Sequence, residues 1–138
     1  MIRSVEDMEV FKKAHILTLE LYKLTNRFPT DERYGLIPQI RRAASSINAN
    51  LMEGSYRNNK KEYRQFVGIS NGSTGELKYH LLLSKDLGYL TNEKYLEIRK
   101  ELDEISKMLR GLIKALTIWK LTLTPIYPNT YLERHRSE

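Results

Sequence analysis

Apolar residues recur along most of this chain at alternating spacings of three and four, which is the period of one face of an α-helix. The pattern predicts four helices, at about residues 5–26, 36–54, 60–87 and 92–123. The last one carries the longest apolar stripe, which runs through Ile98, Leu102, Ile105, Leu109, Leu112, Leu116, Trp119 and Leu123. Four amphipathic helices joined by short connections predict an all-α, antiparallel up-down-up-down four-helix bundle.

Turn and capping residues mark the ends of these helices; they are Ser4 with Asp7, Pro29, Gly54, Asn59 with Glu62, and Gly88. Gly54 is placed to end the second helix as a C-cap, and Gly88 to end the third. Pro125 and Pro128 follow the last helix. We therefore expect residues 1–124 to form the bundle and residues 125–138 to form an irregular C-terminal arm.

A polar stripe runs beside the apolar face of the second helix and consists of Gln39, Arg42, Ser46, Asn50 and Glu53. Polar groups so close to an apolar seam need partners. We therefore expect a buried or half-buried polar seam. In it, Glu53, together with Glu76 of the third helix, satisfies Arg42, Gln39 and Asn50 in a buried network. The alternative is an ordinary helix whose polar residues face water.

Three glycines in the third helix, Gly68, Gly72 and Gly75, are spaced so that they share one face. Each costs about 1 kcal/mol of helix stability relative to alanine. We expect this face to pack closely against the second helix, whose middle is rich in alanine and serine. The competing interpretation is a loop over residues 68–75 that divides the helix.

Composition adds a charge balance and several exclusions. The 138 residues are 41% hydrophobic and carry a formal net charge of +6, which favours acidic partners such as nucleic acid. The absence of cysteine excludes a disulfide framework, a thiolate zinc site and a cysteine nucleophile, and it suits a reducing cytoplasm. No apolar run is long enough to span a membrane. We therefore expect a cytoplasmic protein with no membrane partner.

Basic residues gather in two places. The first cluster lies at the turn between the second and third helices and consists of Arg57, Lys60, Lys61 and Arg64. The second runs along the last helix and consists of Lys100, Lys107, Arg110 and Lys114. Such a stripe can follow a phosphate backbone, and a flat basic helical surface suits RNA shape recognition more than base readout. The alternative is a solvated face, because the stripe is interrupted by Glu97, Glu101, Asp103 and Glu104.

Residues that usually carry catalysis form no recognisable set. His15, His80 and His135 lack the spacing of metal ligands, and we expect His15 to pack near the core. No nucleophile elbow, P-loop or dinucleotide-binding glycine motif is present. We therefore expect no catalytic residue, no metal and no cofactor, and a protein that is not an enzyme.

A series of short motifs stands in order along residues 7–115; they are Tyr34-Gly35-Leu36, Gln39, Arg42-Ala43, Ser46, Asn50, Glu53-Gly54, Glu62-Tyr63, Gly72-Ser73 and Glu76-Leu77. In this order they resemble the four-helix bundle proteins of the 23S rRNA intervening-sequence type. That family is akin to the accessory variability determinant proteins of diversity-generating retroelements. Asn48 departs from the pattern, because the family often has proline there.

The resemblance implies a bundle that assembles into a ring, often a homopentamer, with basic surfaces that bind nucleic acid. In retroelements the relatives assist a reverse transcriptase. Two functions are therefore expected. The first is a non-catalytic homo-oligomer that binds RNA or DNA, with RNA favoured. The second is a structural or protein-interaction bundle without nucleic-acid binding.

Overall fold

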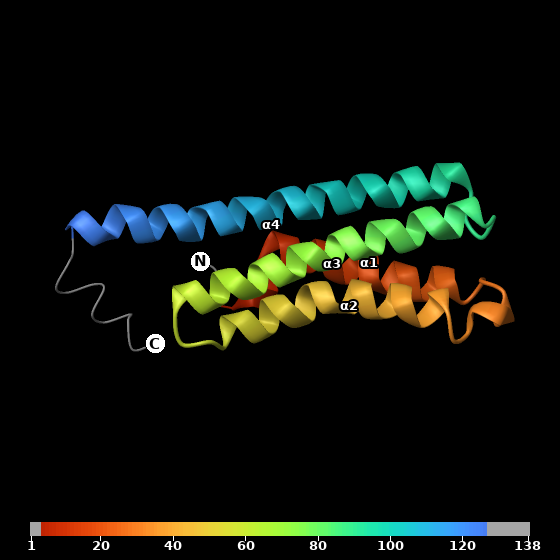
Figure 1. Ribbon diagram of the computed structural model, residues 1–138, viewed down its shortest axis with the longest axis horizontal. Helices are drawn as coiled ribbons and strands as arrows, with labels where there is room; N and C mark the ends of the chain where they lie inside the picture. Colours follow the sequence, from red (N-terminus) through yellow and green to blue (C-terminus); the bar gives the residue numbers. More distant parts are fainter. Residues whose placement is uncertain (1–3, 127–138) are drawn as a thin grey trace.

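The computed structural model describes residues 4–126, with side chains described through residue 117. This range contains two short 3₁₀ turns, η1 (Val5–Asp7) and η2 (Thr30–Glu32), and four α-helices: α1 (Glu9–Thr25), α2 (Leu36–Ser55), α3 (Lys60–Asp86) and α4 (Asn92–Ile126). The helices lie side by side and alternate in direction (Figure 1). The predicted all-α, up-down-up-down four-helix bundle is confirmed.

The core consists of the apolar stripes that the spacing identifies. Its most buried large side chains come from all four helices and include Leu17, Leu21, Ile40, Ile47, Leu51, Leu77, Leu81, Ile98, Leu102, Ile105 and Leu109. Burying each such side chain stabilises the fold by about 1.5–3 kcal/mol relative to leaving it in water. The bundle is therefore held mainly by one continuous apolar core.

The first helix begins later than the sequence predicts. The backbone N–H of Ser4 donates to Asp7 Oδ2 at 3.2 Å, but this pair closes only η1. Met8 is then extended, with φ of −72° and ψ of 138°, so α1 begins at Glu9. Val5 is 6% exposed, which shows that η1 contributes to the core instead of prolonging α1.

Gly54 lies in the last turn of α2, where α3 approaches its backbone closely. A Cβ atom at this position would lie 2.6 Å from Cβ of Phe66, closer than non-bonded carbons can approach. The helix continues through Gly54 to Ser55, and its backbone is not left-handed. The predicted C-cap role of Gly54 is therefore wrong, and the glycine permits contact with α3.

α3 is one continuous helix, so the alternative of a loop over residues 68–75 is not observed. It is followed by Gly88, whose φ of 87° suits the predicted helix end. Gly68, Gly72 and Gly75 are exposed, and a Cβ atom added to any of them would meet no heavy atom within 4 Å. The predicted packing of this glycine face against α2 is therefore wrong.

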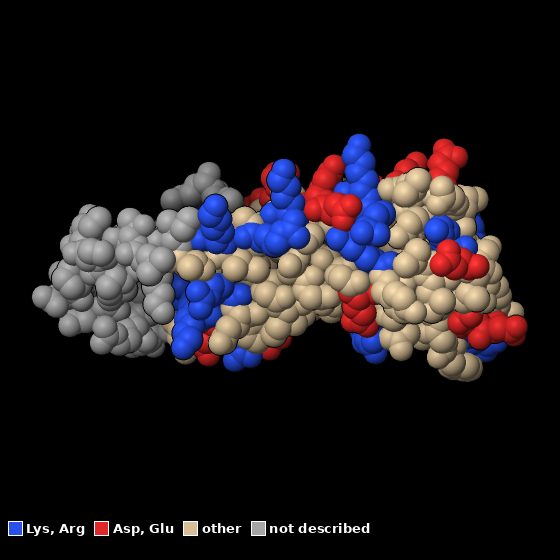
Figure 2. Space-filling view, turned by 45° about the horizontal axis from the view of Figure 1, so that its top comes forward, with Lys and Arg blue, Asp and Glu red and all other residues tan. Residues whose placement is uncertain are grey.

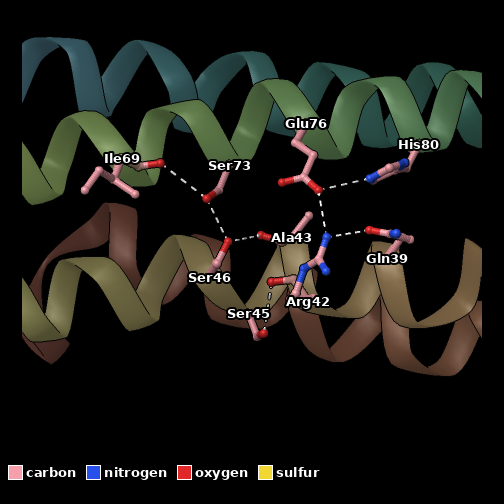
Figure 3. A network of polar contacts seen from close by, with 9 residues as sticks. All are labelled: Gln39, Arg42, Ala43, Ser45, Ser46, Ile69, Ser73, Glu76 and His80. Atoms are coloured by element: carbon pink, nitrogen blue, oxygen red, sulfur yellow. Dashed lines mark hydrogen bonds and ion pairs between the residues drawn. The ribbon is translucent and has the colours of Figure 1, made fainter.

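Serines occupy the face of α3 that does meet α2. Ser70 is fully buried, and its Oγ donates to the backbone oxygen of Ile47 at 2.7 Å. Ser46 Oγ donates to Ser73 Oγ at 2.7 Å (Figure 3). The thin seam expected between the two helices exists, but serines of α3 form it instead of glycines.

α4 is the longest helix, with 35 residues, and it extends beyond the other three at the end where α3 begins (Figure 1). It continues through Pro125 to Ile126, so the first two residues of the predicted arm are helical. The remainder of the arm, 127–138, lies outside the described residues. No helix in the described part of the chain has the length and apolar content needed to cross a membrane.

Candidate nucleic-acid interface

One hydrogen bond links the helices that carry the two basic clusters. Nη1 of Arg64, in the second turn of α3, donates to Oγ1 of Thr117 on α4 at 3.2 Å. Thr117 lies about one helical turn beyond Lys114 and two beyond Arg110. The start of α3 therefore lies against the second half of α4. Figure 2 shows Lys and Arg side chains over both elements on this side of the molecule.

We call this surface the cationic face and define it as Lys61 and Arg64 of α3 with Lys107, Arg110 and Lys114 of α4. Arg64 is half-buried and the other four are exposed. Arg110 donates to Ser106 Oγ at 3.2 Å, a neutral partner. Within the described residues, none of the five forms an ion pair. Their positive charges are therefore not neutralised by carboxylates of the described chain.

The carboxylates that interrupt the basic stripe of α4 are mostly paired with other cations. Asp103 accepts from Lys78 at 2.7 Å and from Arg99 at 3.4 Å, and the hydrogen bond from Lys78 is the main cause that lowers the pKa of Asp103. Glu104 pairs with Lys13 at 2.8 Å, which lowers the pKa of Glu104. Both carboxylates are therefore ionised at neutral pH, and each is paired with a cation outside the cationic face.

The two other carboxylates lie farther from the cationic face. Glu97 pairs with Lys94 at 3.2 Å. Glu101 is half-buried, and burial raises the pKa of its carboxyl group. Beyond Glu104 the sequence of α4 contains no Asp or Glu, so all charged residues in the half of α4 that forms the cationic face are basic. Lys100 is exposed and continues the row two turns before Lys107.

Arg57 is exposed in the turn between α2 and α3, and its side chain is engaged by two neighbours. Its guanidinium forms an ion pair with Glu53 at 3.0 Å and lies over the ring of Phe66, 4.8 Å from the ring centroid. Lys60 is exposed at the first position of α3, beside the cationic face. The structure thus brings together most of the predicted basic residues, while the charge of Arg57 is neutralised by Glu53.

The predicted polar network is present between α2 and α3, but at the surface (Figure 3). Nη2 of Arg42 donates to Gln39 Oε1 and to Glu76 Oε2, the latter at 3.1 Å. Nε2 of His80 lies 3.1 Å from the same Glu76 oxygen. The Arg42 side chain is 65% exposed and that of Glu76 43%, so the predicted burial is wrong. The hydrogen bond from His80, followed by that from Arg42, lowers the pKa of Glu76.

The rest of the polar stripe makes separate contacts. Glu53 pairs with Arg57 and not with Arg42, which corrects the expected partner. Asn50 Nδ2 donates to the backbone oxygen of Ser46 at 2.7 Å, within α2. The six predicted residues therefore divide into a surface ion-pair group, the serine seam and an ion pair at the turn.

The histidines of the described chain lie apart from one another. His80 joins the surface network through Glu76, a partner that the four-residue spacing could have indicated. His15 is exposed, so its predicted packing near the core is wrong. Within the described residues, no group of His, Asp and Glu side chains is arranged to hold a metal ion.

Comparison with known proteins links this geometry to a family. The sequence model of the 23S rRNA-intervening sequence protein family matches residues 6–111. The fold is similar to the crystal structure of a protein with unknown function from the S23 ribosomal protein family of Bacteroides thetaiotaomicron. The TM-score is 0.67 at 26% identity, over 76% of this chain and 98% of that one. No curated protein matches the chain. Neither matching description names a retroelement or a reverse transcriptase.

Proposed function

The chain belongs to the 23S rRNA-intervening sequence protein family, and from this premise we propose that it is a non-catalytic RNA-binding protein. The cationic face contacts the phosphate backbone of the RNA. The observation that carries the proposal is that Lys61, Arg64, Lys107, Arg110 and Lys114 share one surface without a carboxylate partner among the described residues. Each phosphate that such a side chain neutralises releases condensed counterions, which favours binding.

A salt titration tests this proposal. A fluorescently labelled, structured RNA is titrated with the protein at two or more salt concentrations, and anisotropy gives the affinity. We expect log K to fall linearly with log salt, by about 0.7–0.9 per phosphate neutralised. Five contacts therefore predict a slope between about −3.5 and −4.5. Absence of salt-sensitive binding contradicts the proposal.

The RNA-binding form is proposed to be a homo-oligomer, for which the family resemblance implies a ring of about five copies. The exposed glycine face of α3 supports this part. Gly68, Gly72 and Gly75 together cost about 3 kcal/mol of helix stability relative to alanine, and no neighbour within the bundle requires them. A helix of another copy could approach closely there. Gly68 lies one turn beyond Arg64 and two turns beyond Lys61 on the same side of α3, so that copy would lie beside the α3 residues of the cationic face. A ring would repeat the cationic face and raise affinity through avidity. Light scattering gives the mass, and a monomer contradicts this part.

A narrower form of the proposal is assistance to a reverse transcriptase, and it rests on the resemblance alone. Genomic position tests it. A reverse transcriptase gene beside this one supports the narrower form. A reading frame inside a ribosomal RNA gene supports the intervening-sequence role instead.

The second candidate is a protein-interaction bundle that binds no nucleic acid. It is favoured by the groove between α1 and α4, whose lining includes Ile16 and Met108 and which borders the cationic face at Lys107. Their exposed fractions are 66% and 36%, which is high for large apolar side chains. The same titration separates the two candidates, because a bundle of this kind shows no salt-dependent affinity for RNA.

A further inference from the structure

We infer that the cationic face takes double-stranded RNA, with the two strands contacted by different helices. The inference rests on the proposed RNA binding and names the form of RNA that fits. Its basis is the division of the cations into two rows. Lys61 and Arg64 form one row on α3, and Lys107, Arg110 and Lys114 form the other on α4.

The two rows lie on adjacent antiparallel helices in direct contact. The hydrogen bond from Arg64 to Thr117 fixes how the start of α3 lies against α4. Packed helices have axes about 8–10 Å apart, so the two rows arise from neighbouring backbones at that spacing. A-form RNA has a narrow major groove, and the phosphates of its two strands flank that groove closely. The major groove of B-form DNA is about 12 Å wide. Two close rows of cations therefore suit the RNA duplex better.

Both rows are held on long, continuous helices, which fixes the backbone positions from which the cations extend. α3 has 27 residues and α4 has 35. A duplex also presents its phosphates at fixed positions, so little conformational freedom is lost when the two surfaces meet. A flexible single strand would have to be ordered along the rows. The geometry therefore favours the rigid ligand.

The cationic face offers little for single-stranded bases to stack on. Among the described side chains of α4, residues 96–117 include the whole α4 row and contain no aromatic residue, and Trp119 lies outside the described side chains. On α3, Tyr63 is half-buried with its hydroxyl 3.6 Å from Met8 Sδ, and Arg57 covers Phe66. The exposed ring on α3 is that of Tyr79, which lies about four turns beyond Arg64 and outside the α3 row. Proteins that bind single strands usually stack bases on exposed aromatic rings. Tyr56 is 81% exposed in the turn before α3, and it supplies a test.

The test compares three ligands at one salt concentration by anisotropy: a 20-base-pair RNA duplex, a single-stranded 20-nucleotide oligo(U), and a DNA duplex of the same sequence as the RNA. We expect the RNA duplex to bind about tenfold more tightly than oligo(U), because it engages both rows. Removing the α3 row with Lys61→Ala and Arg64→Ala should weaken duplex binding and leave oligo(U) binding nearly unchanged. Lys23→Ala with Arg27→Ala, at the end of α1, is the matched control, and Tyr56→Ala should change neither affinity.

The outcomes separate this inference from the proposed function. Binding to none of the three ligands contradicts RNA binding itself. Binding to oligo(U) as tightly as to the RNA duplex, or its loss in Tyr56→Ala, overturns the duplex inference and leaves RNA binding standing. Equal affinity for the two duplexes overturns the narrow-groove argument. Because Arg64→Ala also removes the hydrogen bond to Thr117, thermal unfolding and an Arg64→Lys variant check the fold. Equal losses for duplex and oligo(U) in a folded α3-row variant overturn the assignment of one strand to each helix.

Discussion

Arg42 of α2 and Glu76 of α3 form an ion pair across the outer surface of the bundle, with 3.1 Å between Nη2 and Oε2. Both side chains are substantially exposed, at 65% and 43%. Exposed ion pairs contribute only about 0–1 kcal/mol, because water and salt screen them and two long side chains lose freedom. The pair therefore adds little to the packing of α2 against α3, which the apolar core and the serine seam hold together.

Glu76→Gln should lower the free energy of unfolding by less than about 1 kcal/mol at pH 7. The folded state lowers the pKa of Glu76 below its ordinary value of 4.5, so its contribution is present above that value and is lost as pH falls through the lowered pKa. Urea unfolding of parent and variant at pH 7 and at pH 3 measures this difference. A loss of several kcal/mol at pH 7 would falsify the surface assignment.

Gly54→Ala should destabilise the protein by about 1–3 kcal/mol, because the added Cβ would press against Phe66. Gly72→Ala is the matched control, since its Cβ meets no atom within the bundle. The control should stabilise the isolated bundle by up to about 1 kcal/mol. Thermal unfolding at low protein concentration compares them. Equal changes in the two variants contradict the close approach at Gly54.

Lys107→Glu combined with Lys114→Glu should weaken RNA binding and make it less sensitive to salt. Neither side chain has a partner among the described residues, so the fold should persist. For each phosphate that the variant no longer neutralises, the slope of log K against log salt becomes shallower by about 0.7–0.9. Lys23→Glu with Arg27→Glu, at the end of α1 and away from the cationic face, reverses the same number of charges and is the control. If the two double variants bind equally, net charge and not the cationic face governs binding.

Asp103→Asn should strengthen RNA binding severalfold. The carboxylate now pairs with Lys78 and Arg99, and its removal would leave both cations without this partner beside the cationic face. Its lowered pKa keeps it ionised at neutral pH, so the substitution removes a full negative charge. Glu93→Gln, in the first turn of α4, is the control. Anisotropy at fixed salt measures both, and unchanged affinity in Asp103→Asn places the RNA elsewhere.

Apolar spacing was sufficient to predict the four helices, but small residues left the α2–α3 seam ambiguous. Glycines and serines both keep a helix thin, and their spacing alone does not say which of them faces α2. The orientation of α3 is set by its buried apolar residues Val67, Leu77 and Leu81, and these could have shown which small residues face α2. Ser70 and Thr74 fall on the same stripe at spacings of three and four, and both are buried.

Whether a polar contact could be predicted from the sequence depended on whether both of its partners belong to one helix. Glu53 and Arg57 are four residues apart, so their pair could have been read from the sequence. The hydrogen bond between Arg64 and Thr117 requires the register between α3 and α4, which packing determines. The separation of η1 from α1 at Met8 could not be predicted from apolar spacing either, because the apolar stripe of α1 begins only at Val10.

The carboxylate-free half of α4 gives the molecule an electrical polarity. On the face seen in Figure 2, Lys and Arg side chains predominate towards the end where α3 begins, whereas Asp and Glu side chains are more frequent towards the opposite end. A polyanion approaching from solution would exert a torque on such a molecule before touching it. The protein would rotate so that the basic end leads, which raises the fraction of encounters that are productive. This preorientation acts on the association rate, and added salt should therefore slow capture as well as weaken the complex.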